Sequence, residues 1–347
     1  MADHLICGSG PLLDAEGRLR EPGYAYRPPF EYNRENIGAP RWRIKDWDYY
    51  LIEDDEYAVA LTFSDLGYIG LVSASVMDFS AGTFKTTSEL VVAPMGSMGV
   101  PAGTDEGEVV WGNARCVVRF WHPAPGLRRV SFAMGRFDGP AALEVEALLD
   151  REPRDSMVIA TPWAENPHAF YYNRKVLGMR AQGGFRVGPL FHEFLPESAL
   201  GLLDAGRGVW TYENTWYWAA AQGYQEGRLV ALNLGYGFGD TSAASENMAF
   251  VDGVAHKLGR VDFGIPRHYD GTYDYLEPWH VTDDEGRLDL AFAPQIDRTD
   301  TIDVLGIVTS RQHQVFGRLT GTVVLDDGTR LAVRGLRASA EHIFNRY

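Results

Sequence analysis

The sequence predicts an all-β protein that contains two antiparallel β-barrels in tandem and few short helices. Alternating apolar and polar residues form many short segments, and turn residues separate them at intervals of roughly 8–12 residues, which is typical of sandwiches and barrels. Aromatic residues make up 12% of the chain and glycine occurs 38 times, which favours short strands with tight turns. A pattern in the first half also recurs in the second half.

Residues 1–40 are rich in Gly, Pro and Arg and lack periodicity, so we expect an N-terminal arm laid over the fold. Period-two patterns begin at Trp42, and we expect residues 41–195 to form the first barrel. Residues 93–107 contain two prolines and four glycines and are predicted to form a long loop. The expected strands of this half are 42–52, 57–63, 67–79, 83–92, 108–121, 127–137, 141–150, 156–162 and 168–180.

Residues 196–347 are expected to form the second barrel domain, which begins with a short helix at 196–206. Glu226-Gly227 and Asp252-Gly253 are residue pairs that two-residue hairpin turns require. The expected strands of this half are 212–223, 227–236, 246–252, 255–263, 273–281, 287–294, 302–311, 314–325 and 329–341.

The two halves share several spaced residues. Trp216 follows Trp47 by 169 residues, Leu232 follows Leu61 by 171, and Gly235 follows Gly67 by 168. An offset this long is not a solenoid repeat, because solenoid units have about 20–50 residues. It is what a duplicated β domain leaves behind.

Composition excludes several functions. The net charge of −15 disfavours binding to nucleic acid and to anionic membrane surfaces. The two cysteines form no disulfide framework, no zinc spacing occurs, and no apolar run reaches the roughly 18 residues of a membrane span. The first residues lack the basic and apolar regions of a secretory signal. We therefore expect a cytoplasmic protein without a metal or cofactor, and its oligomeric state remains open.

The segment from Leu203 to Trp218 is the most informative stretch of the chain. It contains three of the nine tryptophans, and Arg207 lies between two glycines, three residues after Asp204. An arginine in this setting could pair with Asp204 and stack on aromatic rings at the edge of a cavity. Alternatively, the pair could be a structural ion pair that clamps the two barrels together.

Polar residues interrupt the aromatic strand that follows. If residues 212–223 form a strand, Asn214, Trp216, Trp218 and Gln222 share one face. Polar side chains on an inward face require hydrogen-bond partners, so they indicate either a polar network or a lined pocket. The candidate catalytic acids are Asp204 and Glu213. The candidate ligand-binding residues are Arg207, Trp210, Asn214, Trp216, Trp218, Gln222, Asn233, Glu246, Asn247 and His256.

Several segments together resemble the DUF2804 family, which has no assigned activity. They include Gly10–Leu19, Trp42–Tyr49, Leu203–Trp210, Leu232–Gly235 and Phe316–Gly321. More distantly, the chain resembles the two-domain lipocalin-like proteins of the carotenoid 1,2-hydratase and AttH group. That resemblance implies two lipocalin-like (calycin) barrels and a hydrophobic, unsaturated substrate that is hydrated, isomerised or cyclised.

Three functions remain open. The first is an enzyme that binds a lipid, isoprenoid or polyketide-like molecule in an aromatic-lined barrel mouth and uses a carboxyl group for acid–base chemistry, as a cofactor-independent lyase or isomerase. The second is a carrier that needs the same cavity but no proton-transfer group. The third is a carbohydrate-binding or carbohydrate-cleaving protein, in which aromatic rings stack on sugars and paired carboxylates cut the glycosidic bond.

Overall fold

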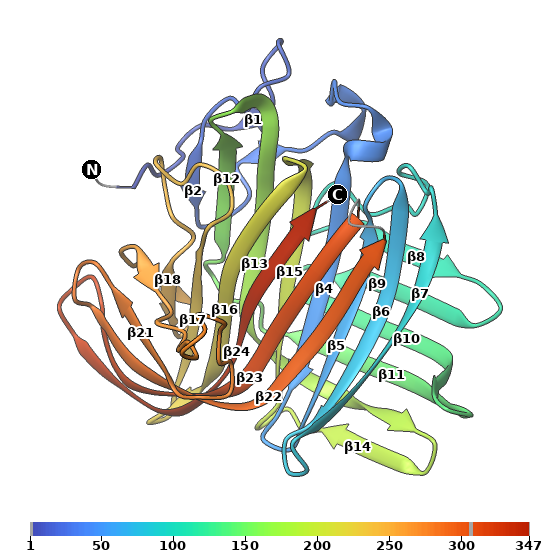
Figure 1. The fold of residues 1–347 in the computed structure, drawn as a ribbon, viewed down its shortest axis with the longest axis vertical. Helices are drawn as coiled ribbons and strands as arrows, with labels where there is room; N and C mark the ends of the chain where they lie inside the picture. The colour runs from blue at the N-terminus through green and yellow to red at the C-terminus, as the bar shows by residue number, and fades with distance from the viewer. Residues whose placement is uncertain (1–2, 305–307, 347) are drawn as a thin grey trace.

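The computed structural model describes residues 3–304 and 308–346, and it confirms the all-β class. Two large antiparallel sheets curl into barrel-like halves and lie side by side (Figure 1). Within the described residues, the helical segments are two single 3₁₀ turns, η1 (Arg34–Asn36) and η2 (Arg41–Arg43). None of the described helices has the length and apolar character needed to span a membrane.

The first sheet follows the order β7-β6-β5-β4-β15-β13-β11-β10-β9-β8. Three further strands, β2, β12 and β14, pair with one another or with β13 at its side. The bounds are β2 (Gly23–Ala25), β4 (Lys45–Glu53), β5 (Tyr57–Asp65), β6 (Ile69–Asp78), β7 (Thr83–Val92), β8 (Glu108–Gly112), β9 (Cys116–Ala124), β10 (Leu127–Asp138), β11 (Ala141–Asp150), β12 (Met157–Trp163), β13 (Asn166–Val187), β14 (Leu190–Phe194) and β15 (Leu200–Val209).

The second sheet follows the order β19-β18-β17-β16-β24-β23-β22-β21-β20. As predicted, Glu226-Gly227 and Asp252-Gly253 close tight hairpins, and all four residues have positive φ. The bounds are β16 (Glu213–Gln225), β17 (Arg228–Tyr236), β18 (Met248–Val251), β19 (Val254–Lys257), β20 (Val261–Asp262), β21 (Trp279–Asp283), β22 (Leu288–Val304), β23 (Val308–Val324) and β24 (Arg330–Arg346).

The N-terminal arm lies against the first sheet. Its strand β2 pairs with β12, while β1 (Gly10–Pro11) and β3 (Phe30–Glu31) form a small parallel pair. Buried arm residues such as Ile6, Leu12 and Phe30 pack against the outer faces of β12, β13 and β15. The arm therefore covers a surface of the sheet that would otherwise be apolar and exposed.

Some predicted elements are wrong. The segment 196–206, expected as a helix, contributes to β15, all of whose residues are buried. A strand buried on both faces shows no alternation, and a short apolar run of this kind cannot be told from a helix by periodicity. The expected strand 273–281 is reduced to β21, and the long hairpin β22–β23 replaces the separate strands 287–294 and 314–325. The expected strand 302–311 includes residues 305–307, which lie outside the described residues.

The boundary between the sheets differs from the one expected at residue 196. Strand β15 pairs with β13 on one side and with β4 on the other, so it belongs to the first sheet. The first sheet ends at Val209 and the second begins at Glu213. The segment that carries Asp204 and Arg207 is therefore a central strand of the first sheet, not a connection between barrels.

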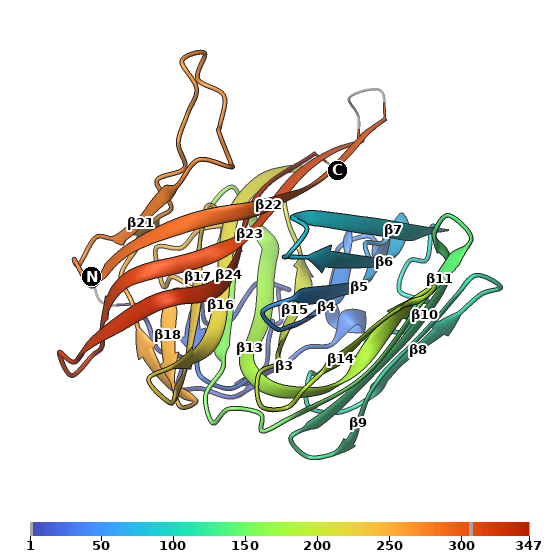
Figure 2. The same cartoon turned by 90° about the horizontal axis from the view of Figure 1, so that it is seen from below.

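Both faces of the central strands are buried, because the sheets pack against each other as well as curling on themselves. In β4, Tyr50 and Ile52 point into the core of the first barrel, whereas Tyr49 and Leu51 point toward the second sheet. A second cluster of buried residues fills the core of the other barrel. The two sheets face each other across a contact layer, which we call the seam (Figure 2). The seam has its own apolar core.

Candidate active site

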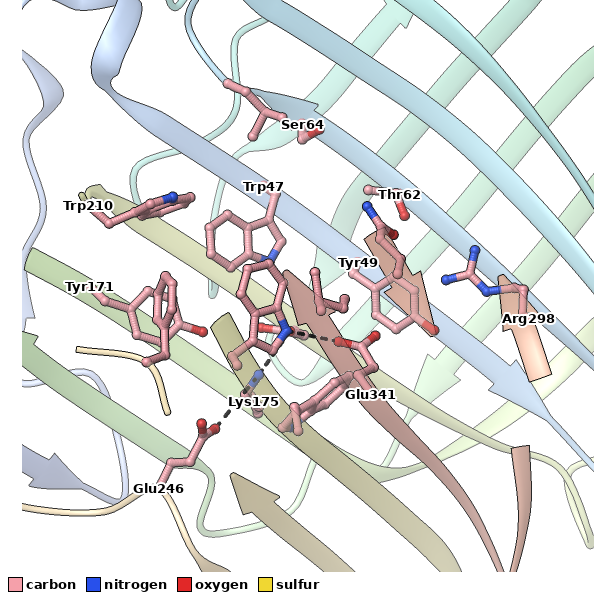
Figure 3. Close-up of a pocket in the computed structure, with 17 residues that line it drawn as sticks. Trp47, Tyr49, Thr62, Ser64, Tyr171, Lys175, Trp210, Glu246, Arg298 and Glu341 are labelled. Carbon is pink, nitrogen blue, oxygen red and sulfur yellow. Dashed lines mark hydrogen bonds and ion pairs between the residues drawn. The ribbon is translucent and has the colours of Figure 1, made fainter. Parts of the chain in front are cut away.

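A pocket of about 170 Å³ lies in the seam. The ligand site expected from the sequence is a barrel mouth, whereas this pocket takes its walls from both sheets. In volume it is close to the roughly 150 Å³ engineered cavity that holds benzene. Its lining residues are Trp47, Tyr49, Thr62, Ser64, Leu66, Tyr171, Lys175, Asp204, Trp210, Trp216, Trp218, Phe238, Glu246, Arg298, Gln312, Glu341 and Ile343 (Figure 3).

One wall is a row of directly paired residues that crosses the first sheet. Lys175 on β13 is opposite Asp204 on β15, Asp204 is opposite Tyr49 on β4, and Tyr49 is opposite Thr62 on β5. Directly paired residues share one face of a sheet. All four side chains therefore point into the seam.

The facing wall is a similar row across the second sheet. Arg298 on β22 is opposite Gln314 on β23, Gln314 is opposite Glu341 on β24, and Glu341 is opposite Trp218 on β16. The two rows touch where Lys175 Nζ lies 4.0 Å from the ring centre of Trp218 and where Gln314 donates to the hydroxyl of Tyr49 at 3.2 Å. The chemistry of the pocket is thus set by the register of eight strands.

Glu341 is the carboxyl group with the most distinctive environment. Its Oε2 accepts a hydrogen bond from Trp216 Nε1 at 3.2 Å, and its Oε1 accepts one from Gln314 Nε2 at 2.7 Å. Burial is the largest influence and raises the pKa of Glu341 to about 7, although these hydrogen bonds and the cations Arg298 and Lys175 favour the ionised form. A group with this pKa can both hold and release a proton near neutrality.

Lys175 carries the positive charge at the other end of the pocket. Its Nζ lies 2.9 Å from Asp204 Oδ2 and 3.8 Å from Glu246 Oε2. Asn173 donates to the second oxygen of Asp204 at 2.6 Å, so this carboxylate is fully engaged. Burial raises the pKa of Glu246. Asp204 therefore serves as the counter-ion of Lys175, and Glu246 is a second carboxyl group nearby.

Aromatic rings close the rest of the pocket. Tyr171 stacks on Trp47 with ring centres 5.8 Å apart, and Phe238 contacts both Trp210 and Trp216 edge-on. Gly206 is directly opposite Trp47, and a Cβ built on Gly206 would lie 2.1 Å from the indole ring. One glycine of the Gly-Arg-Gly sequence is therefore required by the position of this indole.

Asp204 and Arg207 do not pair with each other, which corrects the expected salt bridge. Residues three apart in a strand point to opposite faces of the sheet. Asp204 faces the seam, whereas Arg207 lies on the other face, where it donates to Asp48 Oδ1 at 2.8 Å and to the carbonyl of Pro101 at 2.9 Å. Arg207 holds the 93–107 loop and lies outside the pocket.

The other predicted site residues divide between the pocket and its surroundings. Trp210, Trp216, Trp218 and Glu246 line the pocket together with Asp204. The remaining residues lie elsewhere. Glu213 is exposed and pairs with Arg346 at 2.7 Å; Asn214 donates to Thr211 O; Gln222 bonds Glu53 and Gly178 deeper in the seam; Asn247 bonds Gly235 and Gly259; and His256 lies 3.5 Å from Asp326.

Asn233 supports the pocket without lining it. Its Oδ1 accepts a hydrogen bond from Trp218 Nε1 at 2.8 Å, and its Nδ2 donates to Glu246 Oε2 at 3.2 Å. It therefore orients one aromatic wall residue and one carboxyl group.

Sequence reasoning missed Lys175, Arg298 and Glu341, the groups that define the pocket's charge. Only Glu341 stands out in the sequence, as a charge after the small residues Ala338-Ser339-Ala340, whereas Lys175 follows Arg174 and Arg298 follows Asp297. That signal alone could not identify the pocket, because the three residues come from three strands that are distant in sequence.

The fold and the pocket define an all-β protein of two tandem antiparallel barrels with an aromatic, carboxyl-bearing pocket between them. Residues 3–347 match the family described as a domain of unknown function, DUF2804, and the chain belongs to that family. The resemblance stated from the sequence is thereby confirmed. No curated protein sequence matches the chain.

Solved structures share the fold at low sequence identity. A protein assigned as AttH (NE1406) from Nitrosomonas europaea has a TM-score of 0.54 and 13% identity over 91% of this chain and 96% of its own. CghA, solved with Sch210972, has a TM-score of 0.54 and 14% identity over 87% and 88%. Kievitone hydratase from Nectria haematococca has a TM-score of 0.50 and 10% identity over 87% and 88%.

Proposed function

We propose that this protein binds a hydrophobic small molecule, of lipid, isoprenoid or polyketide type, in the seam pocket and catalyses its hydration, isomerisation or cyclisation. The observation that carries the proposal is the position of Glu341, a carboxyl group with a pKa of about 7 in an aromatic pocket. The shared fold with kievitone hydratase is consistent with it. Glu341 takes the proton-transfer role that the sequence analysis gave to Asp204 and Glu213.

In a hydration, protonated Glu341 gives its proton to one carbon of a substrate double bond, and the cation forms on the other carbon. A water molecule adds to that cation and returns a proton to the Glu341 carboxylate. The ring faces of Trp216 and Trp218 stabilise the cation while it exists. In an isomerisation, the cation instead loses a proton from a neighbouring carbon to the Glu341 carboxylate, which restores the protonated acid.

Lys175 and Asp204 act as a fixed pair in this scheme. Their ion pair is buried, so it holds the end of the pocket in one geometry and engages the Asp204 carboxylate as a partner of Lys175. The nearby Glu246, whose pKa is raised by burial, can accept a hydrogen bond from a substrate or donate one to it.

The test is recovery of the natural ligand and its conversion. The purified protein is extracted into organic solvent for mass spectrometry, and the recovered compound and related unsaturated compounds are then incubated with wild type, Glu341→Gln and Glu53→Gln. Glu53 is a matched control: burial also raises its pKa to about 7, but it lies at the other end of the seam, bonded to Gln222.

We expect turnover by wild type and Glu53→Gln, and a loss of about 10²–10⁴-fold in Glu341→Gln, which is the usual contribution of a general acid. A bound compound that wild type never converts supports a carrier instead. Equal turnover by wild type and Glu341→Gln contradicts the catalytic assignment.

A further inference from the structure

Arg298 makes no direct ion pair in the pocket wall: Glu341 in the same row feels its charge but is joined to it only through Gln314. Its Nε donates to Gln314 Oε1 at 2.8 Å and its Nη1 donates to Ser75 Oγ at 3.2 Å, and both acceptors are neutral. Among residues 3–304 and 308–346, no carboxylate oxygen lies within 4.0 Å of its guanidinium. A partly buried cation normally requires a carboxylate partner or an anionic ligand.

Lys175, the other cation of the pocket, differs in this respect. Asp204 neutralises it at 2.9 Å and Glu246 lies 3.8 Å away. The local positive charge is therefore concentrated at the Arg298 end. An anion that enters the pocket is attracted to Arg298 and repelled from the acidic end.

The groups around Arg298 are hydrogen-bond donors or neutral. Tyr49 accepts from Gln314 Nε2, so its own hydroxyl proton remains available to a ligand, and burial raises the Tyr49 pKa so that it stays a phenol. Figure 3 shows the guanidinium of Arg298 pointing toward Tyr49 and Thr62 at the edge of the pocket. A guanidinium and hydroxyl groups together suit a carboxylate or enolate oxygen.

Gln314 joins this end of the pocket to Glu341. Its amide accepts from Arg298 Nε and donates to Glu341 Oε1 at 2.7 Å. The three residues lie directly across neighbouring strands, so the backbones of Arg298 and Glu341 are about 10 Å apart. A ligand held by its anionic end at Arg298 can thus place a bond several atoms away beside Glu341.

We propose that the ligand of this pocket is an amphipathic acid, in which a hydrophobic ring or branched body carries one carboxylate or enolate that binds Arg298 and Tyr49. This inference rests on the proposed function and names the substrate class for the same site. The pocket volume of about 170 Å³ suits a body of one ring, with any larger portion extending outward.

The test uses a matched pair of probes, 4-phenylbutanoate and 4-phenylbutanamide, which differ in charge and have the same number of non-hydrogen atoms. Binding is measured by calorimetry and by the fluorescence of the pocket tryptophans. The variants are Arg298→Gln, Arg298→Lys and the control Arg318→Gln, which removes an arginine outside the pocket that pairs with Asp55. Thermal unfolding verifies that each variant is folded.

Wild type and Arg318→Gln are expected to bind the acid about tenfold or more tightly than the amide, because hydrogen bonds to a charged group are stronger than those to a neutral one. Arg298→Gln should bind the acid and the amide about equally, and Arg298→Lys should regain part of the preference for the acid. Equal binding of both probes by wild type, or an unchanged preference in Arg298→Gln, overturns the substrate class but not the proposed function. Failure of wild type to bind either probe also overturns the substrate class, whereas the proposed function is decided by the ligand-recovery and turnover experiment.

Discussion

Replacing Glu341 by Gln tests whether burial controls this carboxyl group. The ordinary pKa of 4.5 rises to about 7 in the folded protein. Because one pKa unit corresponds to about 1.36 kcal/mol, ionised Glu341 destabilises the folded protein by roughly 3 kcal/mol. Glutamine has nearly the same shape and cannot ionise, so the substitution removes this cost.

The direction of the pH dependence of stability is set by whether the folded or the unfolded chain ionises first. Below pH 4.5 the carboxyl is protonated in both the folded and the unfolded chain, and it has no cost. Between 4.5 and about 7 the unfolded chain loses its proton first, so the free energy of unfolding of wild type falls as pH rises. Above that window the full cost is present.

The assay is urea unfolding of wild type and Glu341→Gln, followed by tryptophan fluorescence at about pH 4.5 and about pH 8.5. Relative to wild type, the variant should gain roughly 3 kcal/mol of stability between the two conditions. Glu53 titrates in the same range but is present in both proteins, so its effect cancels in the comparison. A difference that stays constant between the two conditions means that Glu341 titrates normally, and it refutes the proposed general acid.

The positions of three residues relative to the seam predict the effects of three further substitutions. Lys175→Met should lower the free energy of unfolding by about 3–5 kcal/mol because Asp204 loses its buried partner, and adding Asp204→Asn should restore much of that loss in urea unfolding. Gly206→Ala should destabilise the protein by about 1–3 kcal/mol and change its tryptophan fluorescence, since a Cβ would lie 2.1 Å from the Trp47 indole; an unchanged spectrum would contradict the close packing. Glu213→Gln should leave ligand binding unchanged and stability within about 1 kcal/mol, because Glu213 forms an exposed ion pair outside the pocket.

Local sequence patterns predicted part of the seam, namely the aromatic strand and a hydrogen-bonded asparagine beside it. Trp216 and Trp218 were predicted to share a face with Gln222, and the structure places all three in the seam. The hydrogen-bonding role of Asn233 could also be anticipated, because an amide within an apolar strand needs a partner. The partners themselves could not be named, since strand register joins residues far apart in the chain.

The pairing of Asp204 with Arg207 failed for a related reason. Proximity in sequence suggested an ion pair, but the segment is a strand and the two side chains point to opposite faces. In the helix expected at 196–206, residues three apart would lie on the same face, so the two side chains would be neighbours. Once β15 is recognised as a strand, Asp204 is placed with Lys175 and Arg207 with Asp48.

The sequence by itself determined the β class, the hairpin turns, the duplicated aromatic strands and the membership of a family, because these depend on local periodicity, turn chemistry and residues at matching positions. Only the tertiary structure decided that the pocket lies between the barrels and that Arg298, Glu341 and Lys175 face it. Those facts depend on which strands pair, in which register, and on the packing of one curled sheet against the other. No local pattern encodes such long-range contacts, so the charged residues of the pocket became visible only in the folded chain.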